Sequence, residues 1–258
     1  MKSIYFSSLL FLFTGCGIQY YSVNMHNTPL LKEKGDLKIN SALSASEESG
    51  DTAALEFQGA YAINEHWGMV ADFHGAKEKY FNGTTNKGFS STVGFGYFTA
   101  LENSNWISET YGSIGGGHAI FKDPNMHYGE YANNYYVSWD RDYYQKHVFS
   151  IVAIQSNIGY KTKYLECALS GKITRLNYFY KEAKLDGAKT TYKYDVDDDP
   201  DGNTYVFLEP GIMFRGGGEN FKIQTAFSLA LGGGDLTCQR VNLSLGLQLS
   251  LNALAKAK

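Results

Sequence analysis

The segment from Val241 to Asn252 alternates strictly between apolar and polar side chains. Valine and five leucines occupy the odd positions, and Asn, Ser, Gly and Gln occupy the even ones. Successive side chains of a β-strand point to opposite faces, so this period of two predicts a strand and excludes a helix. The preceding segment, residues 221–231, repeats the pattern.

Alternation of this kind recurs along most of the chain. The composition agrees with a β-protein, because 28 Gly, 20 Tyr and 16 Phe accompany only 4 Pro. Together with the two segments above, we predict ten strands. The eight further segments are residues 37–45, 53–63, 67–76, 88–98, 106–120, 147–160, 163–180 and 204–215.

Long and short links alternate between these predicted strands. Residues 122–146 and 181–203 form long links, whereas residues 64–66, 161–162 and 216–218 form short ones. In an up-and-down meander every second link lies at the same end, which is the arrangement of transmembrane barrels. We therefore predict an all-β fold, an antiparallel up-and-down β-barrel of about ten strands, with its long loops on the side opposite the termini.

The polar faces of the strands indicate what surrounds the barrel. They carry small neutral residues such as Ser90, Thr92, Gly94 and Ser244, where a soluble barrel would usually show Lys and Glu. Small residues suit the interior of a narrow barrel. Two architectures remain open: a transmembrane barrel with its leucines in lipid, and a soluble, lipid-tethered periplasmic barrel whose inward leucines bind a hydrophobic ligand.

Three smaller expectations concern the strands. Pro210 removes a ladder donor within a predicted strand and normally implies a bulge. Charged residues on the polar faces are expected to fill the lumen, so we predict no large pore; they are Glu56, Asp72, Glu166, Lys172, Glu209 and Lys222. Aromatic residues near strand ends are candidates for interfacial girdles; they are Tyr61, Trp67, Phe98, Trp106, Tyr160, Tyr164 and Tyr178.

The amino terminus has the layout of a secretory signal peptide. Lys2 precedes a short apolar run, which is followed by Thr14, Gly15 and Cys16. Leu12 to Cys16 resembles a lipobox, which predicts a signal peptide over residues 1–15 and lipidation of Cys16, with attached acyl chains such as palmitate. We expect a lipidated N-terminal tether over residues 16–35, the barrel over residues 36–252 and a tail over residues 253–258.

Residues 23–39 (VNMHNTPLLKEKGDLKI) and 60–68 (AYAINEHWG) resemble a group of Bacteroidota outer-membrane β-barrel lipoproteins of poorly defined role. The resemblance implies a cell outer membrane location and a barrel, but no activity. Surface-exported lipoproteins of that phylum tend to carry acidic residues just after the cysteine. Residues 17–20 contain none, so a periplasm-facing anchor is expected.

The sequence offers little sign of catalysis, metal binding or cofactors. Asp197, Asp199, Asp201 and Gly202 match the start of an EF-hand loop, but position twelve is Leu208 instead of glutamate, so we expect no metal. The six histidines lack metal-ligand spacing, and no cofactor is expected. A net charge of −3 without a basic patch argues against nucleic-acid binding. Cys167 and Cys238 are expected to be two separate thiols.

The link over residues 122–146 is rich in aromatic residues, which suits either recognition of a surface glycan or protein partner, or a self-packed cover over the barrel mouth. The candidate recognition residues are Tyr135, Tyr136, Trp139, Tyr143 and Tyr144. We expect a non-enzymatic barrel with a structural or surface-binding role, in contact with outer-membrane lipid. The alternatives are the soluble barrel above and a rim-sited hydrolase or acyltransferase that uses His118 or His147.

Overall fold

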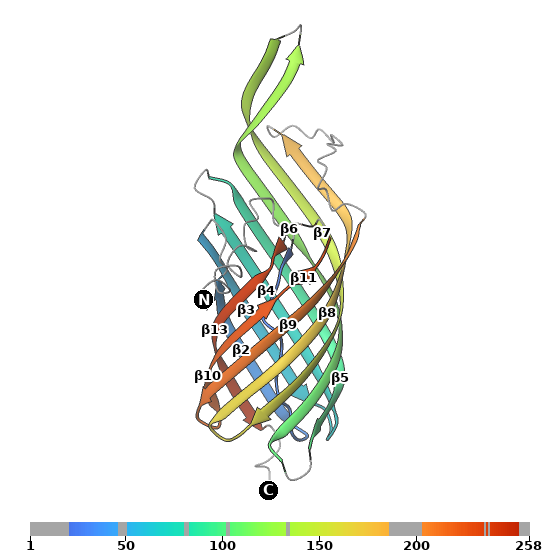
Figure 1. Ribbon diagram of the computed structural model, residues 1–258, viewed down its shortest axis with the longest axis vertical. Helices are drawn as coiled ribbons and strands as arrows, with labels where there is room; N and C mark the ends of the chain where they lie inside the picture. Colours follow the sequence, from blue (N-terminus) through green and yellow to red (C-terminus); the bar gives the residue numbers. More distant parts are fainter. Residues whose placement is uncertain are drawn as a thin grey trace, which may run out of the picture.

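Ten antiparallel strands close into a barrel (Figure 1) in the computed structural model, which describes residues 21–45, 51–79, 83–101, 104–132, 135–185, 203–234, 236 and 238–252. Each strand pairs with the next barrel strand along the chain, and β13 pairs with β2 to complete the ring. The predicted up-and-down fold is therefore confirmed. The barrel strands are β2 (Asp36–Ala45), β3 (Asp51–Ala62), β4 (Trp67–Lys79), β5 (Thr85–Ala100), β6 (Trp106–Ala132), β7 (Tyr135–Lys161), β8 (Leu165–Leu185), β9 (Thr204–Gly217), β10 (Phe221–Leu229) and β13 (Val241–Asn252).

Three two-residue strands lie outside this ring of ten. β1 (Tyr21–Ser22) pairs in parallel with β12 (Cys238–Gln239), and β11 (Leu231–Gly232) continues beside β9 after β10 ends. No helix within the described residues is long and apolar enough to cross a membrane.

The two ends of the barrel differ in their links. Strands β3 and β4, β7 and β8, and β9 and β10 are joined by four, three and three residues at one end, which we call the short-turn end. Asp36 pairs with Asn252 at that same end, so the barrel itself begins and finishes there. The opposite end, which we call the long-loop end, holds the two longest connections between barrel strands, 18 residues from β8 to β9 and 11 from β10 to β13, on the side predicted for long loops.

The long link predicted over residues 122–146 is wrong. β6 and β7 are each 27 residues long and remain paired up to Ala132 and Tyr135, with one register shift between Asp123 and Met126. This hairpin projects past the other strands (Figure 1). The sequence of residues 124–142 lacks the apolar and polar alternation that marks a wall strand.

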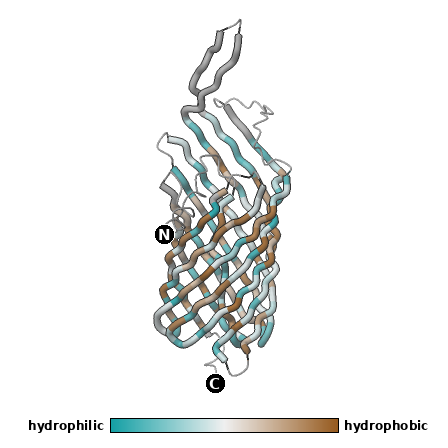
Figure 2. Tube along the Cα trace, in the orientation of Figure 1, coloured by the Kyte–Doolittle hydropathy of each residue, from teal (hydrophilic) through white to brown (hydrophobic). Residues whose placement is uncertain are grey.

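Apolar and polar residues alternate along the barrel strands (Figure 2), and the apolar side chains are the exposed ones. The leucines of β13 are 40% to 64% exposed, whereas Asn242, Ser244, Gln248 and Ser250 between them are buried in the lumen. Every barrel strand contributes to this belt. Its members include Ile39, Leu55, Met69, Val93, Ile114, Val152, Leu169, Leu208, Ile223 and Leu247.

The aromatic residues near strand ends divide into two groups. Trp67 stacks on Phe95 at 5.0 Å between ring centroids, and Trp106 meets Tyr160 edge-on at 5.5 Å, both pairs near the short-turn end. Tyr61 and Tyr164 are also exposed. Phe98 and Tyr178 are buried inside the lumen instead, so the girdle prediction is wrong for these two residues.

Pro210 causes an interruption of pairing and no bulge. It lies opposite Gly171 in an unbroken register between β8 and β9. On its other side, the pairing of β9 with β10 stops at Gly211 and resumes in the same register at Leu208 with β11. The ladder skips the residue that lacks an N–H, which removes the need for an extra residue.

Candidate functional site

A segment ahead of the first barrel strand runs through the lumen. We call residues 21–34 the plug. Val23, Thr28, Leu30 and Leu31 in this segment are fully buried. Residues 16–35 are predicted to form a tether, and no pattern in the sequence predicts that residues 21–31 lie inside the barrel.

The plug runs from the long-loop end to the short-turn end. Tyr21 and Ser22 pair with Cys238 and Gln239, which lie just before β13 begins at the long-loop end. At the other extreme, the Gly35 amide donates to the carbonyl of Ala62 at 2.9 Å, where β3 reaches the short-turn end. The chain then turns back into β2.

The first part of the plug packs in an apolar cluster. The Tyr21 ring stacks on Phe207 at 5.0 Å, and its hydroxyl donates to Glu209 Oε1 at 3.0 Å. Val23 belongs to the same cluster, which closes the lumen near the long-loop end. The wall and loop members of the cluster include Phe149, Ile151, Leu176, Tyr178, Ala230 and Leu236.

The middle of the plug is held by side chains of the wall. The Met25 amide donates to Glu56 Oε2 at 2.7 Å, and its carbonyl accepts from Gln58 Nε2 at 2.7 Å. The Asn27 carbonyl accepts from Gln155 Nε2 at 2.6 Å. Buried backbone groups need partners, and here wall side chains replace the neighbouring strand that an ordinary sheet would supply.

The last part of the plug is held in the same way. The Thr28 carbonyl accepts from Arg215 Nη1 at 2.7 Å, and the Leu30 carbonyl accepts from Lys161 Nζ at 2.8 Å. The Leu31 amide donates to Glu109 Oε1 at 2.7 Å. Polar contacts to the described plug come from nine of the ten barrel strands, namely β2, β3, β4, β6, β7, β8, β9, β10 and β13.

Glycines on the inner face of the wall make room for the plug. A Cβ atom on Gly159 would lie 2.5 Å from Leu30 Cδ2, and one on Gly68 would lie 2.7 Å from Leu31 Cδ1. A Cβ atom on Gly211 would lie 2.7 Å from His26 Nδ1. Wall and plug therefore fit each other closely at three separate strands.

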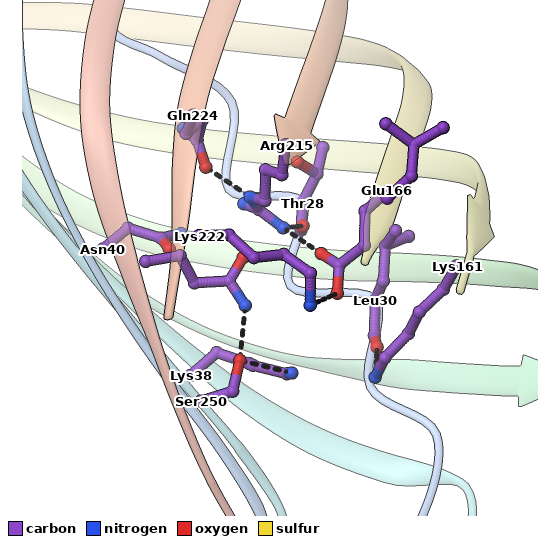
Figure 3. Close-up of polar contacts among 12 residues, drawn as sticks. Thr28, Leu30, Lys38, Asn40, Lys161, Glu166, Arg215, Lys222, Gln224 and Ser250 are labelled. Atoms are coloured by element: carbon purple, nitrogen blue, oxygen red, sulfur yellow. Dashed lines mark hydrogen bonds and ion pairs between the residues drawn. The ribbon is translucent and has the colours of Figure 1, made fainter. Parts of the chain in front are cut away.

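Charged side chains of the wall form ion pairs beside the plug. Glu166 lies 3.2 Å from both Arg215 Nη1 and Lys222 Nζ (Figure 3), and Lys172 Nζ lies 2.6 Å from Glu209. The six charged residues predicted inside all face the lumen. Glu109, Arg215 and Lys38 also face the lumen and were not predicted to do so. Each stands on the inward face of a regular strand, so the sequence pattern could have placed it inside.

The cavities beside the plug are small. Two of them, next to Tyr21 and next to Lys172, measure about 40 and 30 Å³, which is room for a few water molecules. A larger cavity of about 240 Å³ opens at the short-turn mouth between Lys32, Lys38, Lys161 and Lys222.

The two histidines proposed for a rim-sited hydrolase point to opposite faces of the wall. His147 is buried on the lumen side and pairs with Ala119, whereas His118 packs beside the exposed Phe89 at 5.9 Å. Another histidine, His26, lies inside the lumen between a serine and a glutamate. His26 Nδ1 is 2.7 Å from Ser170 Oγ, and His26 Nε2 is 3.7 Å from Glu209.

Two of the five candidate recognition residues have described side chains. Tyr143 is buried and meets Phe121 edge-on at 6.1 Å, and Tyr144 is half-buried with Lys122 Nζ 5.6 Å from its ring. Tyr135, Tyr136 and Trp139 belong to β7, but their side chains lie outside the described part of the chain, as do Cys16 and the acidic run near Asp197. Cys167 and Cys238 are separate thiols, as expected.

No protein-family model matches the sequence, and the search of curated proteins finds no relative. Among solved structures, the chain is similar to a loop-deletion variant of OmpT, an outer membrane protein of Vibrio cholerae (7% identity, 84% of this chain and 98% of that chain, TM-score 0.28). It is also similar to the transport unit of the autotransporter AIDA-I (11%, 84% and 90%, 0.30) and to an active-site variant of outer membrane phospholipase A (10%, 87% and 93%, 0.30), both from Escherichia coli. At these identities and TM-scores the likenesses carry no argument about activity.

Proposed function

We propose that this protein is a plugged, non-enzymatic β-barrel of the bacterial outer membrane, anchored by lipid on Cys16, which contacts a surface partner at its long-loop end. The observation that supports this most is the outward apolar belt on all ten strands around a charged interior. Water disfavours so large an apolar surface, whereas lipid hydrocarbon accepts it. A closed barrel also satisfies the backbone of every strand without water.

The soluble alternative needs the leucines of β13 to line the interior. They point outward, and the lumen holds the plug together with buried ions such as Glu166 and Arg215. Two cavities beside the plug measure about 30 and 40 Å³, which is too small for a hydrophobic ligand, and the larger one at the short-turn end is lined by lysines. The geometry therefore favours the membrane barrel.

The projecting hairpin of β6 and β7 supports a role at the cell surface. Transmembrane barrels carry their short turns on the periplasmic side and their longer connections outside. The two 27-residue strands extend from the long-loop end, so they would stand out from the membrane. We assign to this hairpin a surface glycan as partner, since tyrosine and tryptophan rings are well suited to such contacts.

The Ser170, His26 and Glu209 contacts are assigned a structural role and no catalysis. His26 belongs to the plug, and the cavity beside Lys172 measures only about 30 Å³, which excludes a lipid or a peptide. Lys172 also neutralises Glu209 at 2.6 Å. The three side chains therefore fix the plug against β8 and β9.

The membrane assignment predicts detergent dependence. A Cys16→Ala chain that lacks the signal peptide is expected to fold only in detergent or lipid, because its outward belt needs an apolar environment. Folded protein should migrate differently from boiled protein in a gel. A monodisperse, folded protein in plain buffer would overturn the membrane assignment.

If the hairpin of β6 and β7 binds a surface glycan, a shortened hairpin should bind that glycan less tightly. Asp123 and Tyr143 are paired, so an Asn-Gly turn can join them in place of residues 124–142. This variant should keep its heat-dependent gel shift and lose at least about tenfold of its affinity, equivalent to about 1.4 kcal/mol, for polysaccharide extracted from the producing cells. Equal binding by both proteins would remove the hairpin from the proposal.

A further inference from the structure

The plug has a direction that bears on where the lipid anchor lies. Its first described residue, Tyr21, is at the long-loop end, and its last residues are at the short-turn end. A chain that approached the barrel from the periplasm would be expected to reach β2 directly at the short-turn end. Instead, the chain reaches β2 from the opposite mouth, after crossing the whole lumen.

The contacts of the plug fix this direction at both ends and in the middle. Tyr21 is held to Glu209, Met25 to Glu56 and Gln58, and Leu31 to Glu109. The glycine clearances at Gly68, Gly159 and Gly211 match individual plug side chains. A reversed segment would place different side chains against these glycines and leave buried carboxylates unpaired.

The short distance along the chain from Cys16 to Tyr21 limits where the anchor can be. Five residues span at most about 18 Å when fully extended. The ten residues of β2, at about 3.3 Å per residue and a tilt of about 40°, cover about 25 Å of barrel height. The lumen below Tyr21 is already filled by the plug, so this stretch cannot return through it.

We propose that the chain leaves the barrel through the long-loop mouth and that the lipid on Cys16 inserts into the outer leaflet of the same membrane. This inference rests on the proposed function, because it assumes an outer-membrane barrel with acylated Cys16. It reverses the periplasm-facing anchor that the lack of acidic residues at positions 17–20 suggests. The membrane anchor and the projecting hairpin then share one side of the membrane.

Antibody labelling of epitopes on intact cells tests at which end of the barrel the N-terminal segment leaves the lumen. The same short epitope is placed between Gly17 and Ile18, between Asn133 and Asn134 at the β6–β7 link, or within the short turn at Glu65. We expect antibody to label the first two insertions on intact cells and the third only after permeabilisation. Labelling of the Gly17 insertion only after permeabilisation would overturn the inference.

Two controls separate this inference from the proposed function. If the Asn133 and Glu65 insertions are labelled alike, the barrel does not span the membrane, and both proposals fall. If radioactive palmitate labels Cys16→Ser as strongly as the natural protein, the anchor assignment falls, and the lipid part of this inference falls with it.

A cross-link tests the direction of the plug without any insertion. Tyr21 pairs with Cys238, so Tyr21→Cys should form a disulfide with that native thiol in mildly oxidised, lipidated protein. The matched control is Lys32→Cys, at the other end of the plug, which should form none with Cys238. A folded Tyr21→Cys protein without the cross-link, or a Lys32→Cys protein with it, would contradict the threading direction.

Discussion

A chain from which residues 21–34 are deleted is expected to conduct ions in a planar bilayer, whereas the full chain stays at background. The plug occupies the lumen from one end to the other, and the wall around it is lined by charged and polar groups that would attract water. Glu56, Glu109 and Arg215 would each lose a partner from the plug. Water would hydrate these groups, but the apolar packing of Tyr21 and Val23 inside the lumen would be lost, so the temperature of the heat-dependent gel shift should also fall.

The matched control is the same deletion with a synthetic peptide of residues 21–34 added to the bilayer chamber. The peptide should restore the closed state, because the hydrogen-bonding groups of the wall remain in place. A plug-deleted barrel that folds and stays silent would show that side chains alone close the lumen. A full-length chain with discrete open steps would contradict the plugged barrel itself.

A Leu247→Arg variant is expected to lose about 2–4 kcal/mol of unfolding free energy in lipid vesicles. Leu247 lies at the middle of β13 and points outward, so the arginine would sit in the hydrocarbon centre. Leu251→Arg, on the same face near the short-turn end, should lose only about 0–1 kcal/mol because its charge reaches the interface. Denaturant titration of both variants in vesicles measures the difference.

The difference between the two sites is more informative than either value. Equal losses at Leu247 and Leu251 would mean that the belt does not follow membrane depth. No loss at either site would mean that this face meets water, in which case the outward leucines need a protein partner to cover them.

The barrel wall was predictable because each strand faces two constant environments. Apolar residues face outward and polar residues face the lumen, so the period of two is visible in residues 241–252 and in the nine other predicted segments. The inward ions Glu56, Asp72, Glu166, Lys172, Glu209 and Lys222 follow from the same parity. The girdle prediction was wrong for Phe98 and Tyr178 because it considered only that they lie near strand ends. It ignored that they stand on the inward face of their strands.

The plug could not be predicted from the same signal. The plug contacts wall side chains on several sides. Residues 21–34 therefore have no apolar face and polar face between which their side chains would alternate. The partners of the plug are side chains from nine strands, most of them far apart in the sequence, and along most of its length the plug pairs with no neighbouring strand. The extension of β6 and β7 was missed for a related reason, since residues 124–142 lack the apolar and polar alternation that makes the other strands recognisable.

The direct join between the plug and β2 has a kinetic consequence. Gly35 connects them, so a displaced plug stays covalently attached at the edge of its binding site. A short linker of this kind holds its ligand at a millimolar effective concentration. Recapture would therefore be an intramolecular event independent of protein concentration, and any opening of this barrel would be brief unless an outside force kept the segment away.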